Sequence, residues 1–187
     1  VGGSQWSASA QADLKAFAEA TGLPIAVTFR RQDYMDNRHS HYVGDLGVGQ
    51  NPKLGAALAQ ADCVLLLGTR MGETATNGYT TLDPAAPGTT ILHVHGDAAE
   101  LGRVWPATRS AAAPAPVALA TLLRAARQCP CAEWRSGLRS RYEAWQKPIE
   151  TPGAVKIPGA CHPPTSHPLR HSRSREVGPQ PVAPKPP

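Results

Sequence analysis

Short apolar runs alternate with capped helical segments over residues 1–127. The clearest run, Cys63–Leu67, is ended by Gly68 and is typical of a strand covered on both faces, with Cys63 as a buried free thiol. Leu23–Phe29 and Thr89–Val94 have the composition of further strands, and Arg109–Ala113 that of a short one. Helices between successive strands predict a parallel sheet, so we expect a Rossmann-like, three-layer α/β/α fold with helices on both faces.

Capping residues mark where the helices begin and end. Ser7 or Ser9 can cap a first helix that Gly22 terminates in the left-handed conformation. Asn51 can cap a second helix, and Pro52 suits its first position because that amide has no helical partner. Further helices are expected at residues 98–104, 116–127 and 132–146, and residues 30–50 are expected to form a long loop.

The composition changes near Lys147. Ten of the nineteen prolines lie from Pro152 onward, where they remove backbone donors and fix φ. We therefore expect three parts: the α/β domain at 1–127, a helix and linker at 128–150, and a Pro- and Arg-rich disordered tail at 151–187. The abrupt change of composition suggests, as a hypothesis, that the tail is a frameshift product.

An aromatic stripe runs along the expected helix 132–146. It consists of Trp134, Leu138, Tyr142 and Trp145, which recur at helical spacing. Packing onto the same domain is the favoured interpretation, and an interface with a neighbouring domain is the alternative.

Charge and cysteine content restrict the class of partner. The net charge is +5, but beyond Ile157 four cations oppose one acid, 4 − 1 = +3, so residues before the tail are nearly neutral and no nucleic-acid partner is required. Four cysteines are too few for a disulfide framework. Cys129, Cys131 and Cys161 with His162 lack the paired spacing of a zinc knuckle. Without a long apolar span or leader pattern, we expect a cytoplasmic protein with no membrane contact.

Candidate ligand-binding residues lie where the expected strands end. In parallel sheets the ligand crevice lies at the carboxyl ends of the strands. Gly2, Gly3 and Ser4 look like a glycine turn after the end of a first strand, where backbone can approach a phosphate. Arg70 can bind a pyrophosphate with two hydrogen bonds, and Asp97 can bind a ribose hydroxyl or an adenine amino group. A purely structural turn and surface ion pairs are the alternatives.

The order of several motifs is more specific than any one of them. Residues 29–52 include His39-Ser40-His41-Tyr42-Val43-Gly44-Asp45, followed by Gly68-Thr69-Arg70-Met71-Gly72-Glu73 and later by His93-Val94-His95-Gly96-Asp97 with Glu100. In this order they resemble the central domain of thiamine-diphosphate-dependent enzymes of the acetolactate synthase type, over about two thirds of the chain.

The resemblance implies a nucleotide site of the ADP or FAD type. Family members that bind FAD have an acid where this chain has His95, and for relatives without flavin the resemblance implies a structural role or an ADP-like ligand. It also implies that thiamine diphosphate and magnesium are held only in the complete enzyme, by a glutamate of one neighbouring domain and a Gly-Asp-Gly motif of another. No Gly-Asp-Gly occurs in this chain. We therefore expect an isolated central domain without catalytic residues, whose partners are the thiamine-binding domains, with a homo-oligomer as a candidate assembly.

The resemblance further implies that the first strand is truncated, since Val1 lies where that strand ends, and that the sheet is exposed at its centre. Two other functions remain open from the residues: an NAD-dependent, sirtuin-like enzyme on a similar fold, and a non-enzymatic nucleotide-binding or interaction module. His39 and His41 are interpreted as loop residues rather than metal ligands, and Asp33, Asp36 and Asp45 as turn residues.

Overall fold

The computed structural model describes residues 1–4, 6–85 and 88–147, in which strands and helices alternate as predicted. The order is α1 (Ala8–Thr21), β1 (Ile25–Thr28), β2 (Tyr42–Leu46), α2 (Pro52–Ala59), β3 (Cys63–Leu67), β4 (Thr90–His95), β5 (Arg109–Ala112), α3 (Ala115–Arg124) and α4 (Ala132–Gln146). Short 3-10 turns occur at η1 (Gln32–Tyr34), η2 (Glu73–Thr76) and η3 (Ala98–Glu100). The proline-rich tail predicted at 151–187 and the residues Cys161 and His162 lie outside the described residues.

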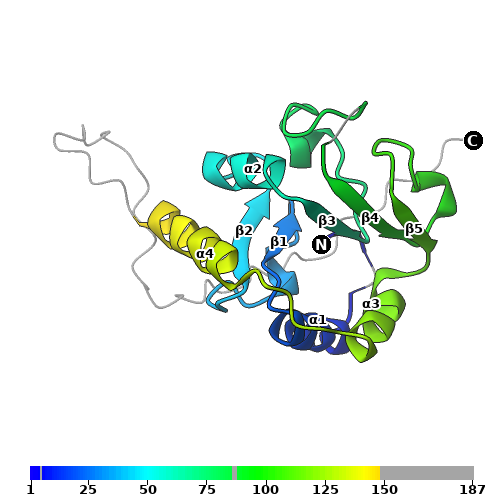
Figure 1. Cartoon of the computed structure of the whole chain (residues 1–187), viewed down its shortest axis with the longest axis horizontal. Helices are drawn as coiled ribbons and strands as arrows, with labels where there is room; N and C mark the ends of the chain where they lie inside the picture. Colours follow the sequence, from blue (N-terminus) through cyan, green and yellow to red (C-terminus); the bar gives the residue numbers. More distant parts are fainter. Residues whose placement is uncertain (5, 86–87, 148–187) are drawn as a thin grey trace, which may run out of the picture. The chain divides into compact units, whose positions relative to one another are not determined.

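Every pair of described strands is parallel. One sheet has the order β1-β2 and the other β3-β4-β5. Helices α1 and α3 pack against each other on one side of the strands, and α2 lies on the other side, with α4 against β2 and α2 (Figure 1). The predicted three-layer α/β/α fold is therefore confirmed.

The predicted helix caps are also confirmed. The Ala10 amide of α1 donates to the Ser7 hydroxyl, and Gly22 ends the helix in the left-handed conformation with φ of 80°. The Lys53 amide of α2 donates to the side chain of Asn51, directly beside Pro52.

The prediction of a long loop at residues 30–50 is wrong, because strand β2 lies within it. The sequence of β2 is interrupted by Gly44 and Asp45, so it lacks the apolar run that revealed β3. Its strand conformation comes from tertiary packing: β2 pairs with β1, and the ring of Tyr42 meets that of Tyr142 from α4 edge to face at 5.2 Å.

Two smaller predictions are also corrected. The helix expected at 98–104 is only the three-residue turn η3, and the chain turns again at Gly102, whose φ is 73°. Cys63 is exposed rather than buried, because only Leu66 and Leu67 of β3 are fully covered. The amino-terminal half of β3 is therefore open on one or more sides.

Arg139 forms several of the hydrogen bonds that hold helix α4 to the domain. The Arg139 guanidinium donates to the backbone carbonyls of Asn37, Arg38, His39 and Tyr42, at distances from 2.8 to 3.3 Å. Leu138 is buried and Tyr142 contacts Tyr42, so these two residues of the aromatic stripe pack onto the same domain, whereas Trp134 and Trp145 are exposed. Among the described residues, no helix has the length and apolar character needed to cross a membrane.

Candidate functional site

A polar cleft lies at the carboxyl ends of β1, β3 and β4. We call it the strand-end cleft; its volume is about 560 Å³, and it lies at the sheet edge where the sequence predicts a ligand site. The loops after these strands form its walls, together with the glycine turn at Gly3. Its charged lining residues are Arg31, Arg70, Glu73, Glu100 and Arg103.

The glycine turn at Gly2-Gly3 forms one side of the cleft. Gly3 has φ of 84°, and a Cβ added there would overlap the carbonyl oxygen of Gly68, so only glycine fits. Gly2 is buried against the side chains of Thr28 and Thr69. The close approach of two backbones therefore requires glycine at position 3, and the Thr28 side chain leaves no room for a Cβ at position 2.

The carbonyl groups of this turn are held by two aromatic side chains. Trp6 Nε1 donates to the Gly2 carbonyl at 3.0 Å, and the Tyr34 hydroxyl donates to the Gly3 carbonyl at 2.8 Å. The two rings stack at 4.9 Å. Helix α1 does not follow the turn at once, because it begins at Ala8. The turn and the helix amino terminus are therefore separate features.

Arg70 lines the cleft directly after β3. Its side chain is 61% exposed and pairs with Glu100 at 3.5 Å, and Arg103 pairs with the same carboxylate oxygen at 3.0 Å. The Glu100 side chain is only 13% exposed. One carboxylate thus holds two arginines at the cleft, and each pair is exposed on its arginine side, where an anion can approach the guanidinium.

The remaining predicted residues lie near the cleft but do not line it. Ser4 is exposed beside the glycine turn. The Asp97 carboxylate accepts a hydrogen bond from the Ala99 amide at 2.9 Å and so caps η3. The Asp97 carbonyl accepts from the Glu100 amide at 3.2 Å, which places Asp97 at the same edge of the sheet as Arg70. His95 does line the cleft, and its Nδ1 accepts from the Asp97 amide at 3.1 Å.

Sequence reasoning missed several residues of the cleft. Arg31 lies in the loop after β1, with its guanidinium 5.6 Å from the centre of the Tyr34 ring. Arg103 and Tyr79 come from loops that follow β4 and β3. These residues could have been suggested by their positions after strand ends. The path of each loop, however, decides which of its side chains turn into the cleft.

His39 and His41 hold the loop before β2 to the helices. His39 Nε2 lies 3.0 Å from the Glu19 carboxylate of α1. His41 Nδ1 lies 2.9 Å from the Leu23 carbonyl, and its Nε2 lies 3.0 Å from Arg135 of α4. Burial lowers the pKa of His41. These contacts give both histidines a structural role, and the described residues contain no cluster of three metal-ligating side chains.

The fold and the cleft define a Rossmann-like α/β domain with a polar site at its strand ends. The family model described as "Thiamine pyrophosphate enzyme, central domain" matches residues 1–122. The chain belongs to this family. The predicted resemblance is therefore confirmed.

Similar curated proteins include the acetolactate synthase large subunit of Corynebacterium glutamicum, 31% identical over 104 residues, which are 56% of this chain and 16% of that protein. The sulfoacetaldehyde acetyltransferase of Alcaligenes xylosoxydans xylosoxydans is 31% identical over 104 residues, 56% of this chain and 17% of that protein. The same enzyme of Castellaniella defragrans is 33% identical over 103 residues, 55% and 17% of the two chains.

The matched region thus spans about a sixth of the length of these relatives. The comparisons lend no support to a nucleotide-binding role, to the sirtuin-like alternative or to a separate interaction module.

Proposed function

We propose that the chain is the central domain of an acetolactate synthase-like, thiamine-diphosphate-dependent enzyme and that its strand-end cleft binds a nucleoside diphosphate of the ADP type. The domain supplies structure and nucleotide binding, and catalysis belongs to neighbouring thiamine-binding domains. The observation that carries the nucleotide proposal is the placement of three arginines around one glycine-bordered cleft.

The charges of the cleft favour a diphosphate. Arg31, Arg70 and Arg103 outnumber Glu73 and Glu100, 3 − 2 = +1, and the guanidinium groups offer donors in a fork that matches phosphate oxygens. Glycine backbone at Gly3 lets an anion approach the main chain closely. A diphosphate can therefore release Arg70 from its exposed pair with Glu100 at small cost.

The cleft has no acid at the position of His95, where the FAD-binding members of the family have one. His95 lines the cleft, and its Nδ1 is occupied by the Asp97 amide, so it lacks the two acceptor oxygens of a carboxylate. Asp97 itself uses its carboxylate to cap η3. The cleft therefore offers an adenine or ribose group fewer hydrogen-bond acceptors than we expect in an FAD site of the family.

The described residues do not fit a thiamine diphosphate or magnesium site. Gly44 and Asp45, which come nearest to the family's Gly-Asp-Gly motif, lie inside β2. Gly44 faces the side chains of Leu54 and Tyr142, with no room for a diphosphate. The reaction of the complete enzyme is therefore assigned to other domains, and a homo-oligomer is proposed as the assembly that would bring them together.

Titration calorimetry with ADP, FAD and coenzyme A tests the nucleotide proposal. We expect ADP to bind, and Arg70→Ala to weaken binding by about tenfold or more, because a charged hydrogen bond contributes roughly 1.5–3 kcal/mol. Arg124→Ala on α3 is the matched control, since Arg124 is exposed and does not line the cleft. No binding at millimolar ADP, or equal effects of both substitutions, would overturn the nucleotide site and leave a purely structural domain.

A further inference from the structure

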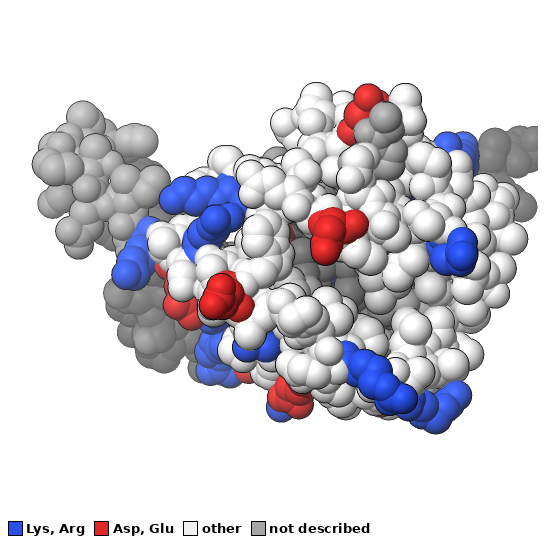
Figure 2. Space-filling view, in the orientation of Figure 1, with Lys and Arg blue, Asp and Glu red and all other residues white. Residues whose placement is uncertain are grey.

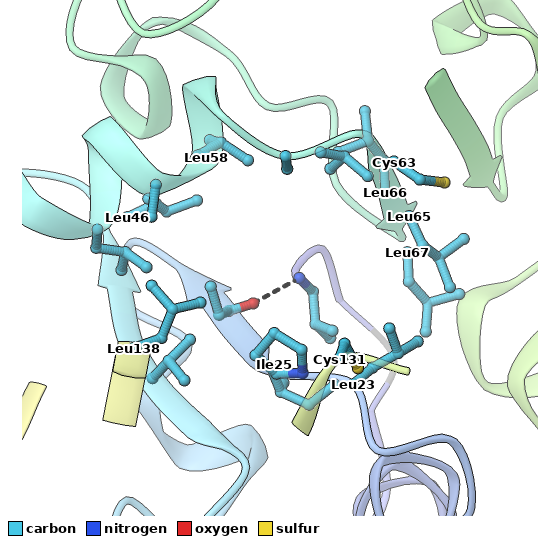
Figure 3. Close-up of a pocket in the computed structure, with 18 of the residues that line it drawn as sticks. Leu23, Ile25, Leu46, Leu58, Cys63, Leu65, Leu66, Leu67, Cys131 and Leu138 are labelled. Atoms are coloured by element: carbon cyan, nitrogen blue, oxygen red, sulfur yellow. Dashed lines mark hydrogen bonds between the residues drawn. The ribbon is translucent and has the colours of Figure 1, made fainter. Parts of the chain in front are cut away.

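A second cavity, which we call the inter-strand groove, differs in chemistry from the strand-end cleft. Its volume is about 530 Å³, and Figure 3 shows leucine side chains of β2, β3 and α4 around it. None of the described residues that line it is Lys, Arg or His. In the view of Figure 2 the surface is hollowed where β1 and β3 lie in Figure 1, and most atoms around the hollow are uncharged. Anionic ligands are therefore expected at the strand-end cleft and not in the groove.

One cationic part of the strand-end cleft lies at the glycine turn. The Tyr34 hydroxyl donates to the Gly3 carbonyl at 2.8 Å, and the Arg31 guanidinium lies 5.6 Å from the centre of the same tyrosine ring. The backbone of Gly3 lies against that of Gly68, directly after β3. A diphosphate that approaches this turn can therefore bind Arg31 from the β1 side and Arg70 from the β3 side.

A second cationic part of the cleft follows β4. Arg103 donates to the Glu100 carboxylate at 3.0 Å through one guanidinium nitrogen, and the Arg103 side chain is 64% exposed. The other N–H groups of this guanidinium can bind an anion without loss of the pair with Glu100. Glu100 also keeps this partner when Arg70 turns to a diphosphate. The cleft can therefore bind two anionic groups at once.

His95, the last residue of β4, supplies another donor at this end of the cleft. Its Nδ1 lies 3.1 Å from both the amide nitrogen and the carbonyl oxygen of Asp97. Nδ1 can accept from the amide in the neutral ring or donate to the carbonyl in the charged ring, so Nε2 carries a proton in both states. A phosphate group favours the charged ring, because an opposite charge stabilises it.

The acids at this end of the cleft already have partners. The Glu100 carboxylate pairs with Arg70 at 3.5 Å and with Arg103 at 3.0 Å, and its side chain is only 13% exposed. The Asp97 carboxylate accepts from the Ala99 amide at 2.9 Å. A ribose at the end of β4 therefore meets hydrogen-bond donors rather than a free carboxylate.

This distribution of groups decides how a ribose can be held. In α/β nucleotide sites the diphosphate lies at the glycine turn, and a group near the end of a following strand binds the ribose. A free acid there accepts hydrogen bonds from ribose hydroxyls, whereas a cation accommodates a phosphate on the ribose. The end of β4 carries His95 and Arg103, which match the second case.

We propose that the β4 end of the strand-end cleft is a second anion subsite, formed by His95 and Arg103, which binds a phosphate monoester on the ribose of the nucleotide. The ligand class is then an adenosine diphosphate that carries a further phosphate on its 2′ or 3′ hydroxyl. This inference rests on the proposed nucleotide function and names the ligand class of the same cleft.

Titration calorimetry of the full chain with three nucleotides tests the proposal. The probes are ADP, 2′-phospho-ADP and 3′-phospho-ADP, which differ by one phosphate group and are measured at the same ionic strength. We expect one of the two phosphorylated nucleotides to bind about tenfold more tightly than ADP, because it gains charged hydrogen bonds from Arg103 and His95. The nucleotide that binds more tightly identifies the hydroxyl that carries the phosphate.

Substitutions then locate the ribose phosphate. Arg103→Gln and His95→Gln should each reduce the preference for the phosphorylated nucleotide several-fold, because each removes one donor of the second subsite. Arg31→Gln is the matched control, since Arg31 lines the same cleft at the glycine turn. It should weaken ADP and the phosphorylated nucleotide by the same factor and so preserve the preference.

The outcomes separate this proposal from the nucleotide proposal itself. Equal affinities for the three nucleotides would overturn the second subsite and leave the ADP site in place. A preference that persists in both Arg103→Gln and His95→Gln, or that Arg31→Gln reduces as much as they do, would also overturn it. If none of the three nucleotides binds at millimolar concentration, both proposals are wrong.

Discussion

The strand-end cleft and the inter-strand groove, an apolar cavity lined by residues of β1, β3, α1 and α2, have similar volumes but opposite chemistry. The cleft, about 560 Å³, is bordered by arginines, glutamates and loop backbone, whereas the groove, about 530 Å³, is bordered by leucines from strands and helices. Side chains of the cleft are solvated and weakly paired, while those of the groove belong to the core. The cleft can therefore change its side chains at little cost in stability, and the groove cannot.

The largest loss of stability is expected for a substitution in the wall of the groove. Leu14 is fully buried, lines the groove and belongs to the main core cluster. Leu14→Ala should lower the free energy of unfolding by about 3 kcal/mol, because it removes buried methyl groups and leaves a cavity. Urea denaturation measures this loss. Val117→Ala on α3, where the side chain is 60% exposed, is the control and should change little. Equal losses of stability in Leu14→Ala and Val117→Ala would contradict the prediction that the groove wall belongs to the core.

A smaller loss of stability is expected for a substitution of Trp105, a core residue near the cleft. Trp105 is 1% exposed, and its Nε1 donates to the Met71 carbonyl at 2.9 Å. Trp105→Phe should cost about 2 kcal/mol, because the buried carbonyl loses its donor. Thermal and urea unfolding measure the effect, with Trp145→Phe at a 49% exposed site as the control. A neutral Trp105→Phe would show that water reaches this carbonyl from the cleft.

The third prediction concerns pH. Burial lowers the pKa of His93, whose Nδ1 has no hydrogen-bond partner within the described residues and whose neighbours include His95 and Glu100. Below about pH 6.5 the unfolded state then binds more protons than the folded state, so stability falls as pH decreases. One such histidine contributes at most about 1.4 kcal/mol per pH unit.

Urea unfolding between pH 7 and 5 measures how steeply the free energy of unfolding falls with pH. His93→Gln, which keeps a donor for the Thr69 carbonyl, should make it shallower. A residual slope should persist, because burial also lowers the pKa of His41. An unchanged slope in His93→Gln would contradict the assignment to His93.

The smallest effect is expected in the cleft itself. Arg70→Ala in the absence of nucleotide should change the free energy of unfolding by no more than about 0.5 kcal/mol, because the Arg70–Glu100 pair is exposed on the arginine side. Urea unfolding with and without ADP separates this small term from the loss of binding. A large loss of stability without ligand would show that Arg70 has a structural role and would weaken the contrast with the groove.

Much of the fold was predictable because local patterns and tertiary packing agree. The caps at Ser7, Gly22 and Asn51 and the apolar run of β3 each act within a few residues. Strand β2 was missed because Gly44 and Asp45 interrupt its pattern, and it forms through pairing with β1 and contact with α4. Cys63 was misjudged because a run of apolar residues does not reveal which end of a strand is covered.

The candidate site was predictable only in outline. The sequence placed Gly3 and Arg70 at one edge of the sheet, since both follow expected strand ends, and the structure brings both to the strand-end cleft. Arg31, Arg103 and Glu100 could not be selected in advance, because loop paths decide which side chains converge.

Periodicity, capping and motif order within short stretches of chain are enough to predict the α/β class, the caps of α1 and α2 and the family. The pairing of β2, the arginine cluster of the cleft and the two apolar faces of the groove depend instead on the tertiary structure. Each of these joins residues that are distant along the chain, and their contacts depend on how strands and helices pack against one another.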